Sequence, residues 1–247
     1  MTRDILLIHG AWAGSWAWGR LVPELEALGW RVTAVDLPGN GTDDTAPADV
    51  SLDLYVAHAG RALAATGGAA VVVGHSGGGI VASQLAEAMP ERVARLVYVA
   101  GIMLPSGGTF LDVIRTLLPS IPAADGIAPH LIWSEDRLTS RVSEAGARAV
   151  FFNDCTRKDA AWAAARLTPQ PERGRAVSPI LTGARFGSIP RVYIEASQDR
   201  SVIPEAQALM QKLTPGARRV VIDAGHVPQL SRPPELAALI DEACATG

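Results

Sequence analysis

The chain lacks the features that mark small secreted domains, nucleic-acid-binding proteins and membrane-surface proteins. Its two cysteines, Cys155 and Cys244, lie far apart and outside any metal-ligand pattern, and two cysteines do not make a disulfide framework. Basic runs are absent and the formal net charge is -3, so nothing attracts nucleic acid or an anionic membrane electrostatically. We therefore expect small, uncharged substrates and neither a nucleic-acid nor a membrane partner.

Long hydrophobic segments are also missing. No apolar stretch approaches the roughly 18 residues that suggest a membrane span, and the N-terminal MTRDILLIHGAWAG lacks the layout of a signal peptide. Internal repeats and low-complexity tails are absent as well. We expect a soluble, cytoplasmic protein, and the length of 247 residues fits one domain with a sizeable core.

Short apolar segments alternate with amphipathic ones along most of the chain. Residues 69–74 (AAVVVG) have no polar alternation, which is typical of a strand buried on both faces. The predicted strands cover residues 4–10, 31–39, 69–74, 94–101, 191–197 and 217–225. The predicted helices cover residues 16–28, 52–63, 78–89 and 204–213, and a last helix follows Pro234 and ends near residue 243. This order predicts an α/β fold, with a mainly parallel sheet covered by helices on both faces.

The alternation breaks between residues 103 and 187. This segment is rich in proline and glycine and has the pattern of short helical pieces rather than strands. We expect residues 1–102 and 188–247 to form the core, and residues 103–187, the inserted segment, to form a mostly helical cap.

The sequence GHSGG, from Gly74 to Gly78, has the G-x-S-x-G spacing of a nucleophile elbow, with a strand pattern before it and a helix pattern after it. A turn tight enough to expose Ser76 leaves no room for side chains two residues away, where Gly74 and Gly78 stand. A Walker loop would need a lysine, and a dinucleotide site would need G-x-G-x-x-G. A glycine-rich turn with an idle serine is the remaining alternative, so the prediction that Ser76 is a nucleophile needs partner residues.

A serine needs a histidine to take its proton and a carboxylate to orient that histidine. His226 lies in DAGHVPQL, just after the last predicted strand, at the sheet edge where Ser76 is also expected. We predict that His226 is the base. His9 and His75 are expected to be hydrogen-bonded parts of the scaffold.

The best candidate for the carboxylate is Asp199. It lies in EASQDRSVIP, on the loop after the strand at 191–197, and the chain order Ser, Asp, His is that of the nucleophile-elbow enzymes. Asp223 is too near His226 along the same strand end to point toward it. Asp36 is expected to organise a loop.

An oxyanion hole needs two backbone N–H groups aimed at the developing negative charge. The first is expected from Gly77, directly after the nucleophile. The second should come from the turn HGAW after the first strand, where we choose the Ala11 amide and keep Trp12 as the alternative.

Five segments together resemble the methylesterase and hydroxynitrile lyase group of the α/β-hydrolase superfamily, which includes plant methyl salicylate esterases and bacterial pyrethroid-hydrolase-like enzymes. They are LLIHGAWAGSWAW, VTAVDLPGNG, VVVGHSGGG, RFGSIPRVYIEASQDRSVIPEAQ and IDAGHVPQL. The resemblance covers nearly the whole chain and implies an α/β-hydrolase fold. It also places the family's triad on Ser76, Asp199 and His226, and its oxyanion hole on Ala11 and Gly77. Relatives often form dimers, and the resemblance alone suggests a homodimer.

Two positions depart from the hydroxynitrile lyases of this group. Those enzymes carry a lysine after the catalytic histidine and a threonine in the first oxyanion turn, where this chain has Val227 and Ala11. Without the lysine, no obvious group would stabilise a departing cyanide. Hydrolysis is therefore favoured over cyanohydrin cleavage.

The sequence thus predicts a serine esterase that forms an acyl-enzyme and needs neither metal nor cofactor, with a small apolar or aromatic ester as its substrate. Amide, lactone or carbamate hydrolysis, lyase chemistry, and a non-catalytic small-molecule receptor are the alternatives. Cys155 is expected to be buried rather than reactive. The candidates for the pocket lining, each of which could equally be ordinary packing, are Trp12, Met103, Leu104, Phe110, Trp133, Phe151, Phe152 and Trp162.

Overall fold

A six-stranded, fully parallel sheet forms the centre of the molecule in the computed structural model, which describes residues 3–245. The strand order is β2-β1-β3-β4-β8-β9, and each neighbouring pair is parallel. The strands are β1 (Asp4–Ile8), β2 (Arg31–Val35), β3 (Ala70–His75), β4 (Val93–Val99), β8 (Arg191–Ala196) and β9 (Ala217–Ile222). All six predicted strands are confirmed, and all their carboxyl ends meet at one edge of the sheet.

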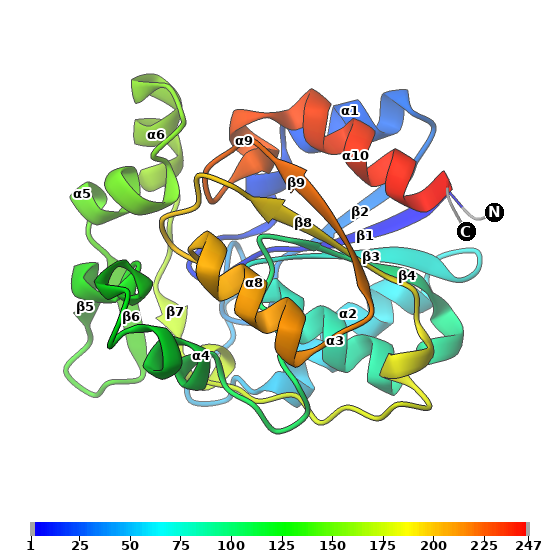
Figure 1. The fold of residues 1–247 in the computed structure, drawn as a ribbon, viewed down its shortest axis with the longest axis horizontal. Coiled ribbons are helices and arrows are strands. Elements are labelled where there is room, and N and C mark those ends of the chain that lie inside the picture. The colour runs from blue at the N-terminus through cyan, green and yellow to red at the C-terminus, as the bar shows by residue number, and fades with distance from the viewer. Residues whose placement is uncertain (1–2, 246–247) are drawn as a thin grey trace.

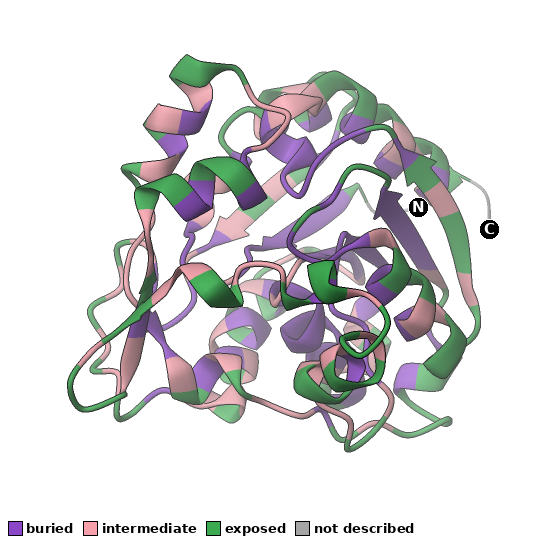
Figure 2. Ribbon diagram, turned by 60° about the vertical axis from the view of Figure 1, so that its left-hand side comes forward, coloured by how far each residue is buried: buried purple, intermediate pink, exposed green. Residues whose placement is uncertain are grey.

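Helices cover both faces of this sheet (Figure 1). On one face, α1 (Leu21–Ala27) and α10 (Pro233–Ala245) pack on Ile5, Leu7 and their neighbours. On the other face, α2 (Leu52–Ala64) and α3 (Gly78–Ala88) pack on Leu6, Ile8 and theirs, and α8 (Pro204–Leu213) lies beside them. Successive residues of β1 thus enter opposite cores, which explains why the central strands have no polar alternation. Figure 2 shows the inner strands buried, whereas the edge strand β9 carries exposed residues.

The helix expected at residues 16–28 is divided in two. A 3-10 turn covers Ser15–Trp18, and α1 begins only at Leu21. Pro23 lacks an N–H and is therefore tolerated only in the first turn of a helix, which fixes where α1 can begin. A further short helix, α9 (Pro228–Ser231), precedes α10.

The inserted segment lies beyond the carboxyl ends of the strands (Figure 1). Its helices are α4 (Phe110–Leu117), α5 (Glu144–Gly146), a π-helix (Ala147–Phe151), α6 (Arg157–Ala164) and α7 (Glu172–Arg175), with 3-10 turns at Pro122–Asp125, Ala128–His130 and Phe186–Ser188. It also has a small antiparallel sheet of β5 (Leu131–Trp133), β6 (Thr139–Val142) and β7 (Gln170–Pro171). The expectation of helical pieces without strands was wrong here, because strands of two to four residues are too short to show an alternation.

Among residues 3–245, no helix is both long enough and apolar enough to cross a membrane.

A buried carboxylate fixes the point where the inserted segment returns to the core. Glu87 of α3 accepts hydrogen bonds from the backbone N–H and the hydroxyl of Thr182, both at 2.8 Å, and from the Phe186 N–H at 3.1 Å. Arg185 donates to the carbonyls of Glu87 and Ala88. Burial acts to raise the pKa of the Glu87 carboxyl, but the donors of Thr182 and Phe186 outweigh it and hold that pKa below its ordinary value.

Replacing Glu87 with alanine should lower the free energy of unfolding by about 2–4 kcal/mol at pH 7, because the N–H groups of Thr182 and Phe186 lose their acceptor. The folded-state pKa of Glu87 lies below its unfolded value. Its contribution is therefore present above the unfolded pKa, about 4.3, and is lost as the pH falls through the folded-state pKa.

Urea titrations at several pH values measure this contribution. The stability difference between wild type and Glu87→Ala should shrink below about pH 4. Glu91→Ala is the matched control, because Glu91 is exposed, and it should change stability by less than about 0.5 kcal/mol. A Glu87→Ala protein as stable as wild type at pH 7 would contradict the anchoring role.

Candidate active site

Ser76 lies on the sharp turn between β3 and α3, in a left-handed backbone conformation with φ of 49°. A Cβ on Gly78 would lie 2.5 Å from the carbonyl oxygens of Ile8 and His9, and one on Gly74 would lie 2.7 Å from the Gly78 carbonyl oxygen. Both approaches are closer than any side chain allows. The expectation that these two glycines make room for the turn is confirmed.

Asp199 and His226 come from the loops after β8 and β9 and form a buried pair. His226 Nδ1 lies 2.7 Å from Asp199 Oδ2, and both residues are 3% exposed. The other carboxylate oxygen, Oδ1, accepts the backbone N–H groups of Ser201 and Val202 at 2.7 and 2.9 Å. The carboxylate therefore needs the proton on Nδ1, which leaves Nε2 of His226 as the basic nitrogen.

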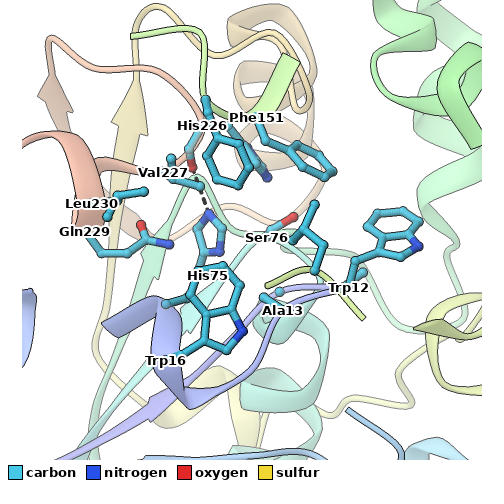
Figure 3. A pocket seen from close by; sticks show the side chains of 15 residues that line it. Trp12, Ala13, Trp16, His75, Ser76, Phe151, His226, Val227, Gln229 and Leu230 are labelled. Atoms are coloured by element: carbon cyan, nitrogen blue, oxygen red, sulfur yellow. Dashed lines mark hydrogen bonds between the residues drawn. The ribbon is translucent and has the colours of Figure 1, made fainter. Parts of the chain in front are cut away.

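Ser76 and His226 line the same small chamber. Figure 3 shows the Ser76 side chain below His226 and Phe151 and beside Trp12. The structure thus brings together the three side chains that the sequence selected, from three separate loops at one edge of the sheet.

The backbone amides of Ala11 and Gly77 come from two different segments, the loop after β1 and the turn at Ser76. The Ala11 nitrogen is 3.7 Å from the position that a Cβ on Gly77 would take. Within the described part of the chain, neither amide donates to another group. The amide of Trp12, by contrast, donates to Gln170 Oε1 at 3.0 Å. Because the Trp12 amide is already engaged with Gln170, Ala11 is favoured over Trp12 as the second donor of an oxyanion hole.

Two chambers meet at Ser76. The small chamber has a volume of about 30 Å³, and the large one has a volume of about 450 Å³. Ser76, Ala11 and Trp12 line both of them. Of the residues expected in the lining, Phe110 and Trp133 line the large chamber, and Phe151 and Phe152 line the small one.

Three residues expected in the lining lie elsewhere. Met103 and Leu104 are fully buried in core clusters of the sheet and of α8. Trp162 packs edge-on against Trp16 and has the Arg166 guanidinium over its ring at 4.1 Å, near the surface. These three side chains are apolar, but apolar character alone does not show whether a side chain lines a chamber or packs in the core.

Polar residues of the large chamber were missed by the sequence reasoning. The Tyr55 hydroxyl accepts hydrogen bonds from Asn40 Nδ2 at 2.9 Å and from Gln170 Nε2 at 3.2 Å. Arg175 lies over the rings of Trp12 and Trp133 and pairs with Glu172. No motif signals these residues, because Tyr55 belongs to a regular helix and the others to the inserted segment or a loop.

The remaining histidines near the site belong to the scaffold, as expected. His75 Nε2 contacts the carbonyl oxygen of His226 at 2.8 Å, the bond drawn in Figure 3. His9 Nε2 accepts the Leu37 N–H, so its Nδ1–H donates to the Gly10 carbonyl. Burial lowers the pKa of both imidazoles, which keeps them neutral.

The rival carboxylates also have structural roles. Asp36 accepts from the backbone N–H groups of Ser15 and Thr42 and so organises its loop, as expected. Asp223 is exposed and accepts from the side chains of Ser197 and Gln198 rather than from His226.

Cys155 is partly buried rather than fully buried. Burial raises the pKa of its thiol to about 12, so a reactive thiolate is disfavoured. Among residues 3–245, no three His, Cys, Asp or Glu side chains gather into a group that could hold a metal ion.

The sequence matches known proteins over almost its whole length. A family model described as the alpha/beta hydrolase family matches residues 5–239. A pyrethroid hydrolase of Sphingobium wenxiniae is 32% identical over 255 residues, which cover 96% of this chain and 86% of that protein. Methylesterase 7 of Arabidopsis thaliana is 28% identical over 256 residues, covering 97% and 95% of the two chains.

Solved structures agree with these matches. A pyrethroid hydrolase from Sphingobium faniae superposes with a TM-score of 0.87 at 28% identity, over 100% of this chain and 98% of that one. A polyneuridine aldehyde esterase superposes with a TM-score of 0.85 at 22% identity, over 98% and 99% of the two chains. The second likeness concerns the fold alone.

Gly78→Ala should lower the free energy of unfolding by about 1–3 kcal/mol or more, because its Cβ would overlap the carbonyls of Ile8 and His9. Gly77→Ala is the matched variant, since its Cβ would meet nothing nearer than the Ala11 nitrogen at 3.7 Å. It should change stability by less than about 1 kcal/mol. Urea unfolding of both variants measures this difference, and equal stabilities would contradict the close approach at Gly78.

Proposed function

This chain belongs to the alpha/beta hydrolase family and is a carboxylic ester hydrolase, and we propose that Ser76, His226 and Asp199 carry out its reaction. The observation that supports this assignment best is the buried pair of Asp199 and His226 in the chamber that the strained Ser76 also lines. In such a site the carboxylate fixes the tautomer of the imidazole, and the imidazole activates the hydroxyl.

The first half of the reaction forms an acyl-enzyme. Ser76 Oγ attacks the ester carbonyl carbon while Nε2 of His226 takes the hydroxyl proton. The negative charge that develops on the carbonyl oxygen is stabilised by the N–H groups of Ala11 and Gly77. The carbon–oxygen bond to the alcohol then breaks, and His226 returns the proton to the leaving alkoxide.

The second half releases the acid. Water attacks the acyl carbon and gives a proton to Nε2 of His226, and the bond between the acyl group and Ser76 Oγ breaks. His226 then protonates Ser76 Oγ. In both halves, the Asp199 carboxylate accepts the hydrogen bond from Nδ1–H of His226. It thereby stabilises the positive charge of the imidazolium.

The large chamber suggests the class of substrate. Its volume of about 450 Å³ suits a ligand of modest size, and its lining includes Ile80, Val81, Phe110 and Trp133. We propose that a small apolar or aromatic ester binds there, and that the inserted segment is the cap that covers it. By their names, one relative hydrolyses pyrethroids and another is a methylesterase, and both names support hydrolysis of a small organic substrate.

Lyase chemistry has less support. Val227, which follows His226, is buried among apolar residues of the small chamber. The chain has two lysines, Lys158 and Lys212, and neither lines either chamber. A departing cyanide would therefore meet no ammonium group, which favours hydrolysis.

Ser76→Ala should reduce kcat for p-nitrophenyl acetate by at least about 10³-fold, because the nucleophile is lost, while the protein stays folded. Initial rates and far-UV circular dichroism measure the two properties. Turnover retained by a folded Ser76→Ala protein would overturn the assignment of the nucleophile.

Asp199→Asn should reduce kcat by about 10⁴-fold with little change in KM, because an amide can hold the imidazole in the wrong tautomer. Steady-state kinetics on the same ester measure this loss. A drop of less than about tenfold would show that Asp199 does not orient His226.

A non-catalytic receptor on the same scaffold predicts a different outcome. An esterase should turn over simple aryl esters many times, and a serine-reactive phosphonyl reagent should abolish that turnover. A receptor should show a single slow turnover at most. Parallel assays with ester, amide, lactone and carbamate substrates then separate the hydrolases from one another.

A further inference from the structure

One stretch of the inserted segment contacts two loops of the core. They are the loop after β8 that carries Asp199, called the acid loop below, and the loop after β9 that carries His226, called the base loop. Asn153 Nδ2 donates to the carbonyl oxygen of Gln198 at 3.1 Å, next to Asp199. The backbone N–H of Gly225, next to His226, donates to Asp154 Oδ2 at 2.8 Å. Consecutive side chains thus reach two different loops of the core, each at the residue directly before a triad candidate.

The two loops are also hydrogen-bonded to each other directly, since the Asp223 carboxylate accepts from the side chains of Ser197 and Gln198. The Gln198 N–H donates to the Ala224 carbonyl at 2.9 Å. The Gly225 N–H lies beyond this bond, in a buried position, and a buried N–H without an acceptor costs about 1–3 kcal/mol. A carboxylate is a strong acceptor for it, because a charged partner strengthens the hydrogen bond.

The side chains of Asn153 and Asp154 lie close to Gly225. A Cβ at this position would lie 2.5 Å from both Asn153 Oδ1 and Asp154 Oδ1. A larger residue at Gly225 would therefore displace these two side chains, which pack directly on the backbone of the base loop.

A π-helix precedes this contact. Residues Ala147–Phe151 form it, and the Phe152 N–H donates to the Ala147 carbonyl at 3.0 Å. Such single-turn π segments are rare and often occur at functional sites. Here the segment places the Phe151 ring against the His226 ring, with 5.3 Å between centroids and an interplanar angle of 26°. Figure 3 shows the two residues side by side above Ser76.

Apolar packing joins the same pieces. Val227 and Leu230, which follow His226, form one buried cluster with Ala147, Val150 and Phe152. This part of the inserted segment is therefore packed into the catalytic edge of the core, unlike the part formed by α4 and β5, which lines the large chamber.

We propose that Asp154, assisted by Asn153, is a positioning residue that fixes His226 against Asp199 by holding Gly225 and Gln198. This inference rests on the proposed function, in which His226 is the base. Asp154 touches neither the substrate nor the reacting atoms. It acts by keeping the base loop close to the acid loop, so that Nδ1 of His226 stays within hydrogen-bond distance of Asp199.

Asp154→Ala should lower kcat by about 10- to 100-fold with KM changed less than about threefold, because displacement of a catalytic group by about 1 Å can cost 10²-fold. Asp154→Asn should stay within about threefold of wild type, since its amide oxygen can still accept the Gly225 N–H. Rates on p-nitrophenyl acetate are divided by the number of active sites titrated with a phosphonyl reagent, so a loss of folded protein does not count as a loss of kcat.

Glu144→Ala is the matched control. Glu144 is also a carboxylate of the inserted segment, but it is exposed and pairs with Arg148 rather than with either loop. Its kcat should stay within about threefold of wild type. Asn153→Ala is the milder second variant in case Asp154→Ala does not fold, and its kcat should fall by about three- to tenfold.

Hydrogen exchange gives a readout that does not depend on the reaction. The Gly225 amide should exchange faster in Asp154→Ala than in wild type and Asp154→Asn. The proposal is overturned if Asp154→Ala has the same kcat per titrated site as wild type. If Asp154→Ala does not fold, the same result in Asn153→Ala overturns it. Equal losses in Asp154→Asn and Asp154→Ala overturn it as well. If wild type hydrolyses no ester, the proposed function fails. The positioning role of Asp154 is tested separately, because an unchanged exchange rate of the Gly225 amide in Asp154→Ala would refute it.

Discussion

The close approach of α3 to the end of β1 is the constraint on which the rest of the site depends. Gly78 lies so near the carbonyls of Ile8 and His9 that only a hydrogen atom fits there. This contact fixes the start of α3 directly after Ser76, whose backbone is in the left-handed conformation. It also brings Gly77 beside Ala11, because Ala11 comes two residues after His9. One packing contact therefore sets both the position of the Ser76 hydroxyl and the closeness of Gly77 to the Ala11 amide.

The parallel sheet supplies the second element of the site. Parallel strands end at the same edge, so the loops after β3, β8 and β9 meet although they are far apart along the chain. The hydrogen bond between Asp199 and His226 joins two of these loops. His75 adds a further link, since its ring contacts the His226 carbonyl from the end of β3.

The inserted segment has two different relations to this edge. Residues of α4, β5 and α7 line the large chamber and leave open space over Ser76. The π-helix and Asn153–Asp154 instead pack on the acid and base loops. Changes in the first part can alter the shape of the chamber with little effect on the catalytic geometry, whereas changes in the second part act on His226 itself.

The sequence by itself determined the six strands of the central sheet, the turn at Ser76 and the residues of the candidate site. GHSGG, Asp199 and His226 could be found because strand ends and glycine spacing are local features, and parallel order converts them into neighbours in space. Only the tertiary structure decided which apolar residues line the chambers. Met103, Leu104 and Trp162 are as apolar as Phe110 and Trp133, but they pack elsewhere. The contacts of Tyr55, Gln170 and Asp154 were likewise invisible in the sequence, because each depends on a partner that folding brings from a distant part of the chain.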